Sequence, residues 1–143
     1  MRLNWLSDKV PVWVAALWWG SLATIGFLVV PLLFAHLPTA AMAGTVAAKL
    51  FTAQTWVSLA CGLALLVLAR GERTSGQPNR AKAAFAFTLG GMLLALLLEF
   101  GVAPRILARE NLALWHRLGT GMYVLQWICA GVTFWKVADS RSA

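Results

Sequence analysis

The chain has 143 residues, of which 60% are hydrophobic and 12% are charged. This composition lies outside the range of soluble globular domains, so we expect residues 1–143 to form a single domain of membrane-spanning helices. The formal charge of +7 would suggest nucleic acid for a soluble protein, but basic loops of a membrane protein serve anionic lipid headgroups, and we exclude nucleic acid as a partner.

Four apolar stretches follow one another along the chain. Each can cover the ~30 Å hydrocarbon core of a bilayer, because that thickness needs about 20 mostly apolar residues in a helix. The stretches are too long for the strands of a membrane barrel, and lipid admits only helices or closed barrels. The sequence therefore predicts an all-α polytopic membrane protein, an antiparallel bundle of four transmembrane helices, at approximately residues 12–34, 50–69, 83–103 and 113–135.

Two residues mark the end of the first stretch and the approach to the second. Pro31 lacks a backbone N–H, so it is expected to kink the first helix and to free a backbone carbonyl. Thr39 follows a proline and precedes an alanine-rich segment. That pattern predicts a capping threonine at the start of a short interfacial helix that leads into the second span.

The basic residues predict the orientation of the bundle. Eight of the 12 Lys and Arg residues lie in the two termini and in the loop between the second and third stretches, and the other four lie on the opposite side. Because cytoplasmic loops carry the excess of Lys and Arg, both termini and the middle loop are expected in the cytoplasm. The middle loop, residues 71–80, is polar and rich in turn residues, and it is expected to tether two helical hairpins.

Glu99 is the residue of the third stretch whose transfer into hydrocarbon costs the most free energy. It follows a charge-free run over residues 83–98, and Arg105 marks the outer end of that helix. The helical rise places the carboxylate ~7 Å below the interface, where it needs a partner, water or a proton. His116 on the fourth helix lies at a similar depth, with Arg105 and Arg117 as competing partners. Glu99 either pins the helices, belongs to a ligand, proton or cation site, or extends to the interface without a further role.

The fourth stretch carries a polar stripe at helical spacing. Its members are His116, Thr120, Tyr123 and Trp127, with Gln126 on a neighbouring face. The second stretch adds Gln54, Thr55 and Ser58. These groups either form ordinary interhelical hydrogen bonds or line a polar crevice that opens outward between the helices.

A family resemblance rests on several short motifs. The segments that carry it cover residues 16–27, 31–34, 37–38, 43–44, 50–51, 99–105 and 116–119. The most specific is Glu-Phe-Gly-x-x-Pro-Arg, which begins at Glu99. The chain resembles the bacterial inner-membrane family called domain of unknown function 4149, related to eukaryotic transmembrane protein 205. His116 departs from the Leu-His-Gly motif expected in that family. The resemblance implies a four-helix protein of the bacterial inner membrane and supplies no mechanism.

The leading functional hypothesis is a non-enzymatic binding or transport-accessory protein with an outer-facing polar site. The members of that site are Glu99, Arg105, His116, Arg109, Lys49 and His36. Cations outnumber carboxylates in this set, which favours an anionic small molecule or an anionic lipid as the ligand.

Two other classes of function stay open. A haem- or quinone-linked membrane oxidoreductase or electron carrier would use His36 and His116 as ligands, with Glu99 passing protons. Copper would be bound by histidine together with Met42 or Met122. Haem and copper are therefore the candidate cofactors. The chain has no GxSxG motif, no Gly-rich phosphate loop and no zinc-ligand spacing. A structural subunit of a larger complex would instead bind a membrane-protein partner or a second copy of the chain.

Overall fold

The computed structural model describes residues 2–70 and 78–139, and within these ranges every regular element is helical. This confirms the all-α prediction. The elements run in chain order as α1 (Arg2–Ala23), η1 (Thr24–Val29), α2 (Val30–His36), α3 (Ala40–Arg70), α4 (Pro78–Leu97), η2 (Leu98–Val102), α5 (Ala103–Leu107) and α6 (Leu112–Asp139). The predicted tether begins with residues 71–77, which lie outside the described residues.

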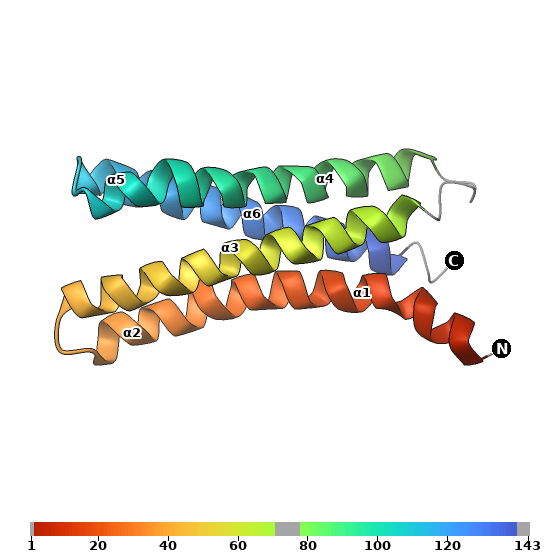
Figure 1. The fold of residues 1–143 in the computed structure, drawn as a ribbon, viewed down its shortest axis with the longest axis horizontal. Coiled ribbons are helices and arrows are strands. Elements are labelled where there is room, and N and C mark those ends of the chain that lie inside the picture. Colours follow the sequence, from red (N-terminus) through yellow and green to blue (C-terminus); the bar gives the residue numbers. More distant parts are fainter. Residues whose placement is uncertain (1, 71–77, 140–143) are drawn as a thin grey trace.

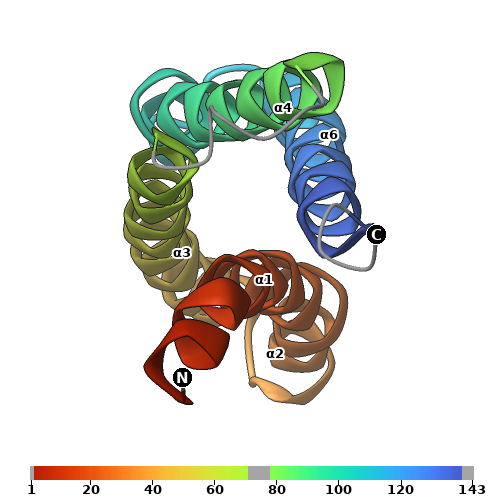
Figure 2. The ribbon, with the colours of Figure 1, turned by 90° about the vertical axis from the view of Figure 1, so that its right-hand side faces the viewer.

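The elements form four antiparallel rods. Two of the rods are composite, since α1, η1 and α2 follow one another without a break, as do α4, η2 and α5. Figure 1 shows the α2–α3 and α5–α6 connections at one end, and the start of α1 and the end of α6 at the other. Seen end-on in Figure 2, the rods occupy the corners of a ring in the order α1, α3, α4, α6, and each packs against its two neighbours. The predicted antiparallel four-helix bundle is confirmed.

Three of the rods are long and apolar enough to cross a membrane. They are Lys9–His36, Ala40–Ala69 and Lys82–Leu107 in the described part of the chain. With 28 residues, α6 is as long as the first of these. Its inner face carries the polar side chains of Tyr123, Gln126 and Thr133.

The second rod begins earlier than the sequence predicts. It starts at Ala40 and runs without interruption to Arg70, so the expected interfacial helix and the expected span at residues 50–69 are one helix. The cap at its start is confirmed, because the Met42 backbone N–H donates a hydrogen bond of 3.2 Å to the Thr39 hydroxyl. That bond satisfies one of the backbone donors that every helix start leaves unpaired.

Each composite rod contains one π-helical segment shortly before a proline. The Val30 N–H bonds to the Ile25 carbonyl, and the Ala103 N–H bonds to the Leu98 carbonyl. Both bonds span five residues, in place of the four of an α-helix. The interruption expected near Pro31 is therefore present as a wide turn, and the same arrangement precedes Pro104.

Tyr123 of α6 contacts the first of these wide turns. Its hydroxyl donates a hydrogen bond of 2.9 Å to the Leu22 carbonyl, which in a regular α-helix accepts from the N–H of residue 26. The aromatic ring lies against Gly26, where a Cβ atom would overlap Cε1 of the ring. A side chain that enters the helical ladder in this way is a recognised cause of a local break, and we assign η1 to it.

Trp18 fills the centre of the ring of helices. It extends from α1 across the bundle to α4, which is not one of the two neighbours of α1 in the ring. A Cβ atom at Gly91 would lie 2.8 Å from Cη2 of Trp18 and 3.5 Å from Cβ of Cys129. The glycine therefore provides the space that the indole occupies. Cys129 is a free buried cysteine, as is Cys61.

Candidate functional site at the α2 and α5 end

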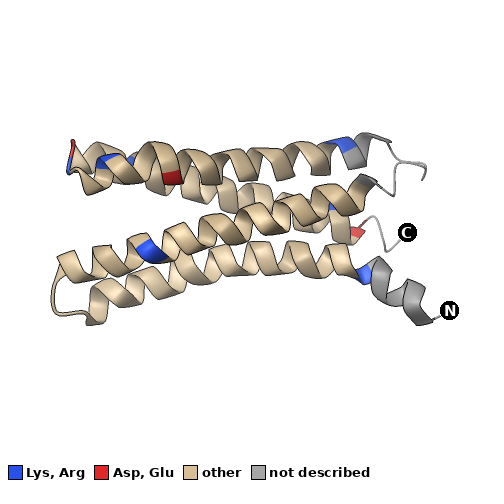
Figure 3. Ribbon diagram, viewed as in Figure 1, with Lys and Arg blue, Asp and Glu red and all other residues tan. Residues whose placement is uncertain are grey.

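The six residues predicted to form the binding site lie toward one end of the bundle. His36 ends α2, Lys49 lies in the first third of α3, and Glu99 belongs to η2. Arg105, Arg109 and His116 lie in α5, in the turn after it and in the first turns of α6. Charged positions gather toward the two ends of the rods in Figure 3. The same end therefore carries all six residues, while their joint role as a site stays a prediction.

Glu99 is held by a residue that the sequence analysis did not single out. The Thr52 hydroxyl donates a hydrogen bond of 2.9 Å to Oε1 of Glu99, and this bond joins α3 to η2. The expected contact with His116 or with a nearby arginine is not formed among the described residues. Glu99 is half-buried and Thr52 is exposed, so the carboxylate stays accessible beside its partner.

We expect Thr52→Val to destabilise the bundle by about 0.6 kcal/mol, the average for a hydrogen bond between membrane helices. Valine keeps the branched shape and removes the only donor of the side chain. Unfolding in mixed micelles by increasing dodecyl sulfate measures the change. Thr52→Ser keeps the hydroxyl and is expected to retain the wild-type free energy of unfolding, so equal losses in both variants would contradict a role for the hydrogen bond.

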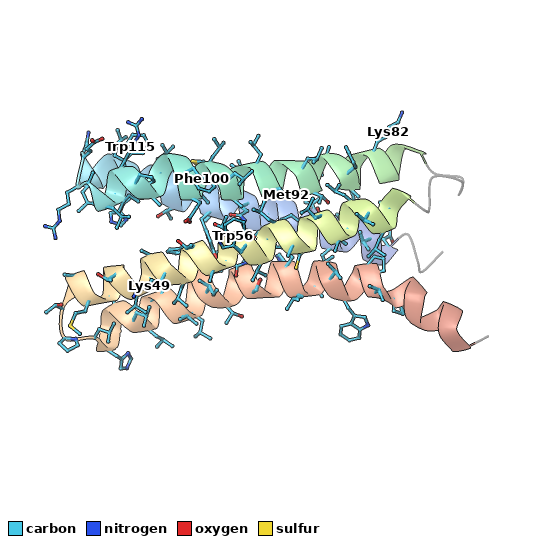
Figure 4. The ribbon with its side chains drawn as sticks, viewed as in Figure 1. Lys49, Trp56, Lys82, Met92, Phe100 and Trp115 are labelled. Atoms are coloured by element: carbon cyan, nitrogen blue, oxygen red, sulfur yellow. The ribbon has the colours of Figure 1, made fainter. Side chains whose placement is uncertain are left out.

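Arg105 lies over the ring of Trp115. The guanidinium carbon is 4.6 Å from the ring centroid, which is the geometry of a cation–π contact between α5 and α6. Trp115 lies at the α5 end of the bundle in Figure 4. A tryptophan that orients an arginine at a helix end is typical of the boundary between hydrocarbon and headgroups, where Arg binds phosphate through its planar N–H groups.

The turn between α5 and α6 presents Arg109 at the tip of the bundle. Arg109 has a φ angle of 56° and Asn111 one of 38°, so both adopt the left-handed conformation that costs a residue with a Cβ atom about 1 kcal/mol. Backbone bonds hold the turn, among them Arg109 N–H to the Ile106 carbonyl at 3.1 Å and Glu110 N–H to the Arg105 carbonyl at 3.1 Å. The position of Arg109 thus follows from the backbone rather than from a side-chain partner.

The two histidines are exposed at this end of the bundle. The Nδ1 atom of His36 lies 3.0 Å from the Leu32 carbonyl. A carbonyl can only accept, so Nδ1 is the donor in this contact. Among the residues that the structure describes, no group of three or more His, Cys, Asp or Glu side chains could hold a metal ion. Haem ligation by His36 and His116 stays a prediction.

The polar residues of the second and fourth stretches meet inside the bundle. Gln126 Nε2 donates a hydrogen bond of 3.1 Å to the Ser58 hydroxyl, and both side chains are buried. Of the two interpretations from the sequence, interhelical hydrogen bonding holds for this pair. Ser21 of α1 belongs to the same group, because Gln54 Nε2 donates a hydrogen bond of 3.0 Å to its hydroxyl. A serine in an apolar run gives no signal that would identify its partner.

Comparison with known proteins places the chain in a family. The sequence profile described as Domain of unknown function (DUF4149) matches residues 13–114. The chain belongs to the DUF4149 family. Searches of curated proteins and of solved structures gave no significant match.

The DUF4149 match covers the first rod from residue 13 onward, the second and third rods, and the first residues of α6. Of the predicted site, His36, Lys49, Glu99, Arg105 and Arg109 lie within the matched residues. His116 lies beyond residue 114, so its departure from the expected family motif falls outside the match. The relationship to eukaryotic transmembrane protein 205 that the resemblance implies stays an expectation.

Proposed function

We propose that this DUF4149 protein is a non-enzymatic binding or transport-accessory protein of the bacterial inner membrane, with its site at the α2 and α5 end. The ligand is a phosphate- or carboxylate-bearing molecule at the membrane boundary. The observation that carries the proposal is the placement of Arg105 over Trp115 at 4.6 Å. That contact orients a guanidinium at a rod end and leaves its N–H edges available for an anion.

The charges around Arg105 support an anionic ligand. The described residues at this end include four cations, Lys49, Arg105, Arg109 and Arg117, and two carboxylates, Glu99 and Glu110. The Thr52 hydroxyl already occupies one oxygen of Glu99. The carboxylate therefore serves best to fix α3 against η2 and to bind a donor group of the ligand, while the cations bind its anionic group.

In the proposed topology all four rods cross the membrane. The start of α1, the end of α6 and the α3–α4 connection then lie in the cytoplasm, and the α2 and α5 end faces the opposite side. The excess of Lys and Arg in the termini and the middle loop supports this orientation. Three rods meet the length and composition required for a span, and α6 completes the ring between α4 and α1.

The test is lipid binding by the double variant Lys49→Gln with Arg105→Gln. Each cation near a membrane surface contributes about 1 kcal/mol to the binding of anionic lipid, so we expect roughly 30-fold weaker retention of phosphatidylglycerol. Native mass spectrometry of protein exchanged into defined lipid mixtures measures the retained lipid, with phosphatidylcholine as the zwitterionic reference.

The matched control removes the same charge from the other end. Lys82→Gln with Lys136→Gln changes two cations at the start of α4 and the end of α6, and Lys82 lies at the far end from Trp115 in Figure 4. The proposal requires the control to retain phosphatidylglycerol. Equal loss of phosphatidylglycerol from the two double variants would show a general effect of charge. Full retention by Lys49→Gln with Arg105→Gln would contradict the proposed site.

A further inference from the structure

A layer of polar side chains crosses the middle of the bundle, away from the site at the α2 and α5 end. Gln54 and Ser58 lie within one turn of the centre of α3, and Gln126 lies at the centre of α6. Ser21 lies near the middle of the Lys9–His36 rod. Hydrogen bonds connect these four residues at one depth. With the rods centred in a bilayer, this depth is the midplane of the hydrocarbon core.

The hydrogen bonds of this layer fix the orientation of the Gln54 amide. The Ser21 hydroxyl donates its proton to the backbone carbonyl of Trp18 at 2.9 Å. The Ser58 hydroxyl donates to the backbone carbonyl of Gln54 at 2.9 Å. Each serine oxygen can then only accept from a side-chain amide. The Nε2 atom of Gln54 lies 3.0 Å from Ser21 Oγ and 3.5 Å from Ser58 Oγ. A flipped amide would leave both contacts without a proton.

This orientation leaves a buried acceptor without a donor. Gln54 is 2% exposed, and its Oε1 atom has no hydrogen-bond partner among the described residues. Trp18 is 0% exposed, and its Nε1 donor also has no hydrogen-bond partner among the residues that the structure describes. Ser21 contacts both residues, through the Trp18 carbonyl and through the Gln54 amide. Two residues that Ser21 contacts therefore carry one unpaired acceptor and one unpaired donor, inside a bundle where hydrocarbon offers no substitute.

We propose that the midplane polar layer is a binding site for water inside the bundle, where ordered water donates to Gln54 Oε1 and accepts from Trp18 Nε1. Water is the smallest molecule that both donates and accepts, and buried water typically bonds to two to four protein groups. The layer contains no charged side chain among its described members, which favours a neutral guest over an ion. The serine oxygens already accept from amide groups, so few oxygens remain to coordinate a cation.

Two tryptophans at nearly one depth make the proposal testable. Trp18 is 0% exposed, whereas Trp56, which lies between Gln54 and Ser58 in the sequence of α3, is 59% exposed on the outside of the bundle. In a bilayer the exposed surface of Trp56 faces hydrocarbon. The proposal predicts that the more buried indole contacts water and the more exposed one does not.

The measurement is polarisation transfer from water to indole N–H groups, by solid-state NMR of ¹⁵N-tryptophan protein in lipid bilayers. Trp18→Phe and Trp56→Phe assign the two signals by their loss. We expect transfer to the Trp18 indole to be several-fold faster than to Trp56, and comparable with transfer to Trp135, which is exposed near the end of α6. Transfer to Trp18 that is as slow as to Trp56, or fast transfer to all three, would overturn the proposal.

A substitution within the layer gives a second, independent measurement. Gln54→Leu removes the unpaired acceptor and is expected to reduce water transfer to Trp18 several-fold. Thr55→Val alters the neighbouring residue, whose hydroxyl donates to the Phe51 carbonyl of its own helix, and is expected to leave the Trp18 signal unchanged. Equal effects of the two variants would contradict the assignment of Gln54 as the water acceptor. The wild-type comparison of Trp18 with Trp56 stands even if Gln54→Leu does not fold.

Discussion

Truncation of Trp18 to alanine is expected to destabilise the bundle by about 3–5 kcal/mol, the range for removing a large aromatic side chain from a packed core. The indole is fully buried, reaches Gly91 on the far side of the ring and lies beside Cys129. No neighbouring element can move into that space without leaving its own contacts. Unfolding by dodecyl sulfate in mixed micelles, followed by circular dichroism, measures the change.

Trp56→Ala is the matched control for this prediction. It removes the same side chain at a similar depth, from a position that is 59% exposed on the outside of the bundle. Lipid or detergent fills the vacated space, so the change in the free energy of unfolding should stay below about 1 kcal/mol. If the two variants lost equal stability, Trp18 would not be the centre of the packed core.

Gly26→Ala is expected to destabilise the bundle by about 3 kcal/mol, at the upper end of the usual range for overpacking. The new Cβ atom would overlap Cε1 of Tyr123. The ring cannot move away freely, because its hydroxyl is bonded to the Leu22 carbonyl at 2.9 Å. Thermal unfolding of the purified protein in detergent, followed by tryptophan fluorescence, measures the loss as a lower midpoint.

Two further variants separate overlap from a general effect of alanine. Gly20 lies in the same rod, and no atom lies within 4 Å of a Cβ built there, so Gly20→Ala should be neutral or slightly stabilising. In Gly26→Ala with Tyr123→Leu, the smaller side chain removes the overlap. The double variant should therefore be more stable than the sum of the two single changes predicts, by at least about 1 kcal/mol. Additive changes would contradict a direct contact.

The four rods are predictable from the sequence because their signal is local. Each apolar stretch reaches the length that a bilayer requires, and Thr39 before an alanine-rich segment is a local capping pattern that the structure confirms. The ends were less predictable. Residues 40–49 were predicted as a short interfacial helix separate from the span, yet they continue into it without a break, because helix formation does not stop at the hydrocarbon boundary.

The contacts between rods are not predictable in this way. Tyr123 and Leu22 are 101 residues apart, and their pairing depends on the rotation of each helix about its own axis. Glu99 was recognisable as a costly carboxylate, but its partner Thr52 is one of several threonines in apolar surroundings. Gln54 and Gln126 were recognisable as polar, whereas the unpaired state of Gln54 Oε1 depends on hydroxyl protons donated elsewhere.

The two π turns set the rotation of the polar end of the bundle. A turn that holds one additional residue rotates everything beyond it by about 100° relative to an uninterrupted α-helix. In both composite rods the residues beyond the turn are those of α2 and α5, which carry His36 and Arg105. The helical phase at this end is therefore decoupled from the phase of the packed core. Side chains at this end can be reoriented by the gain or loss of one residue in a wide turn, while the apolar contacts of α1 and α4 keep their register.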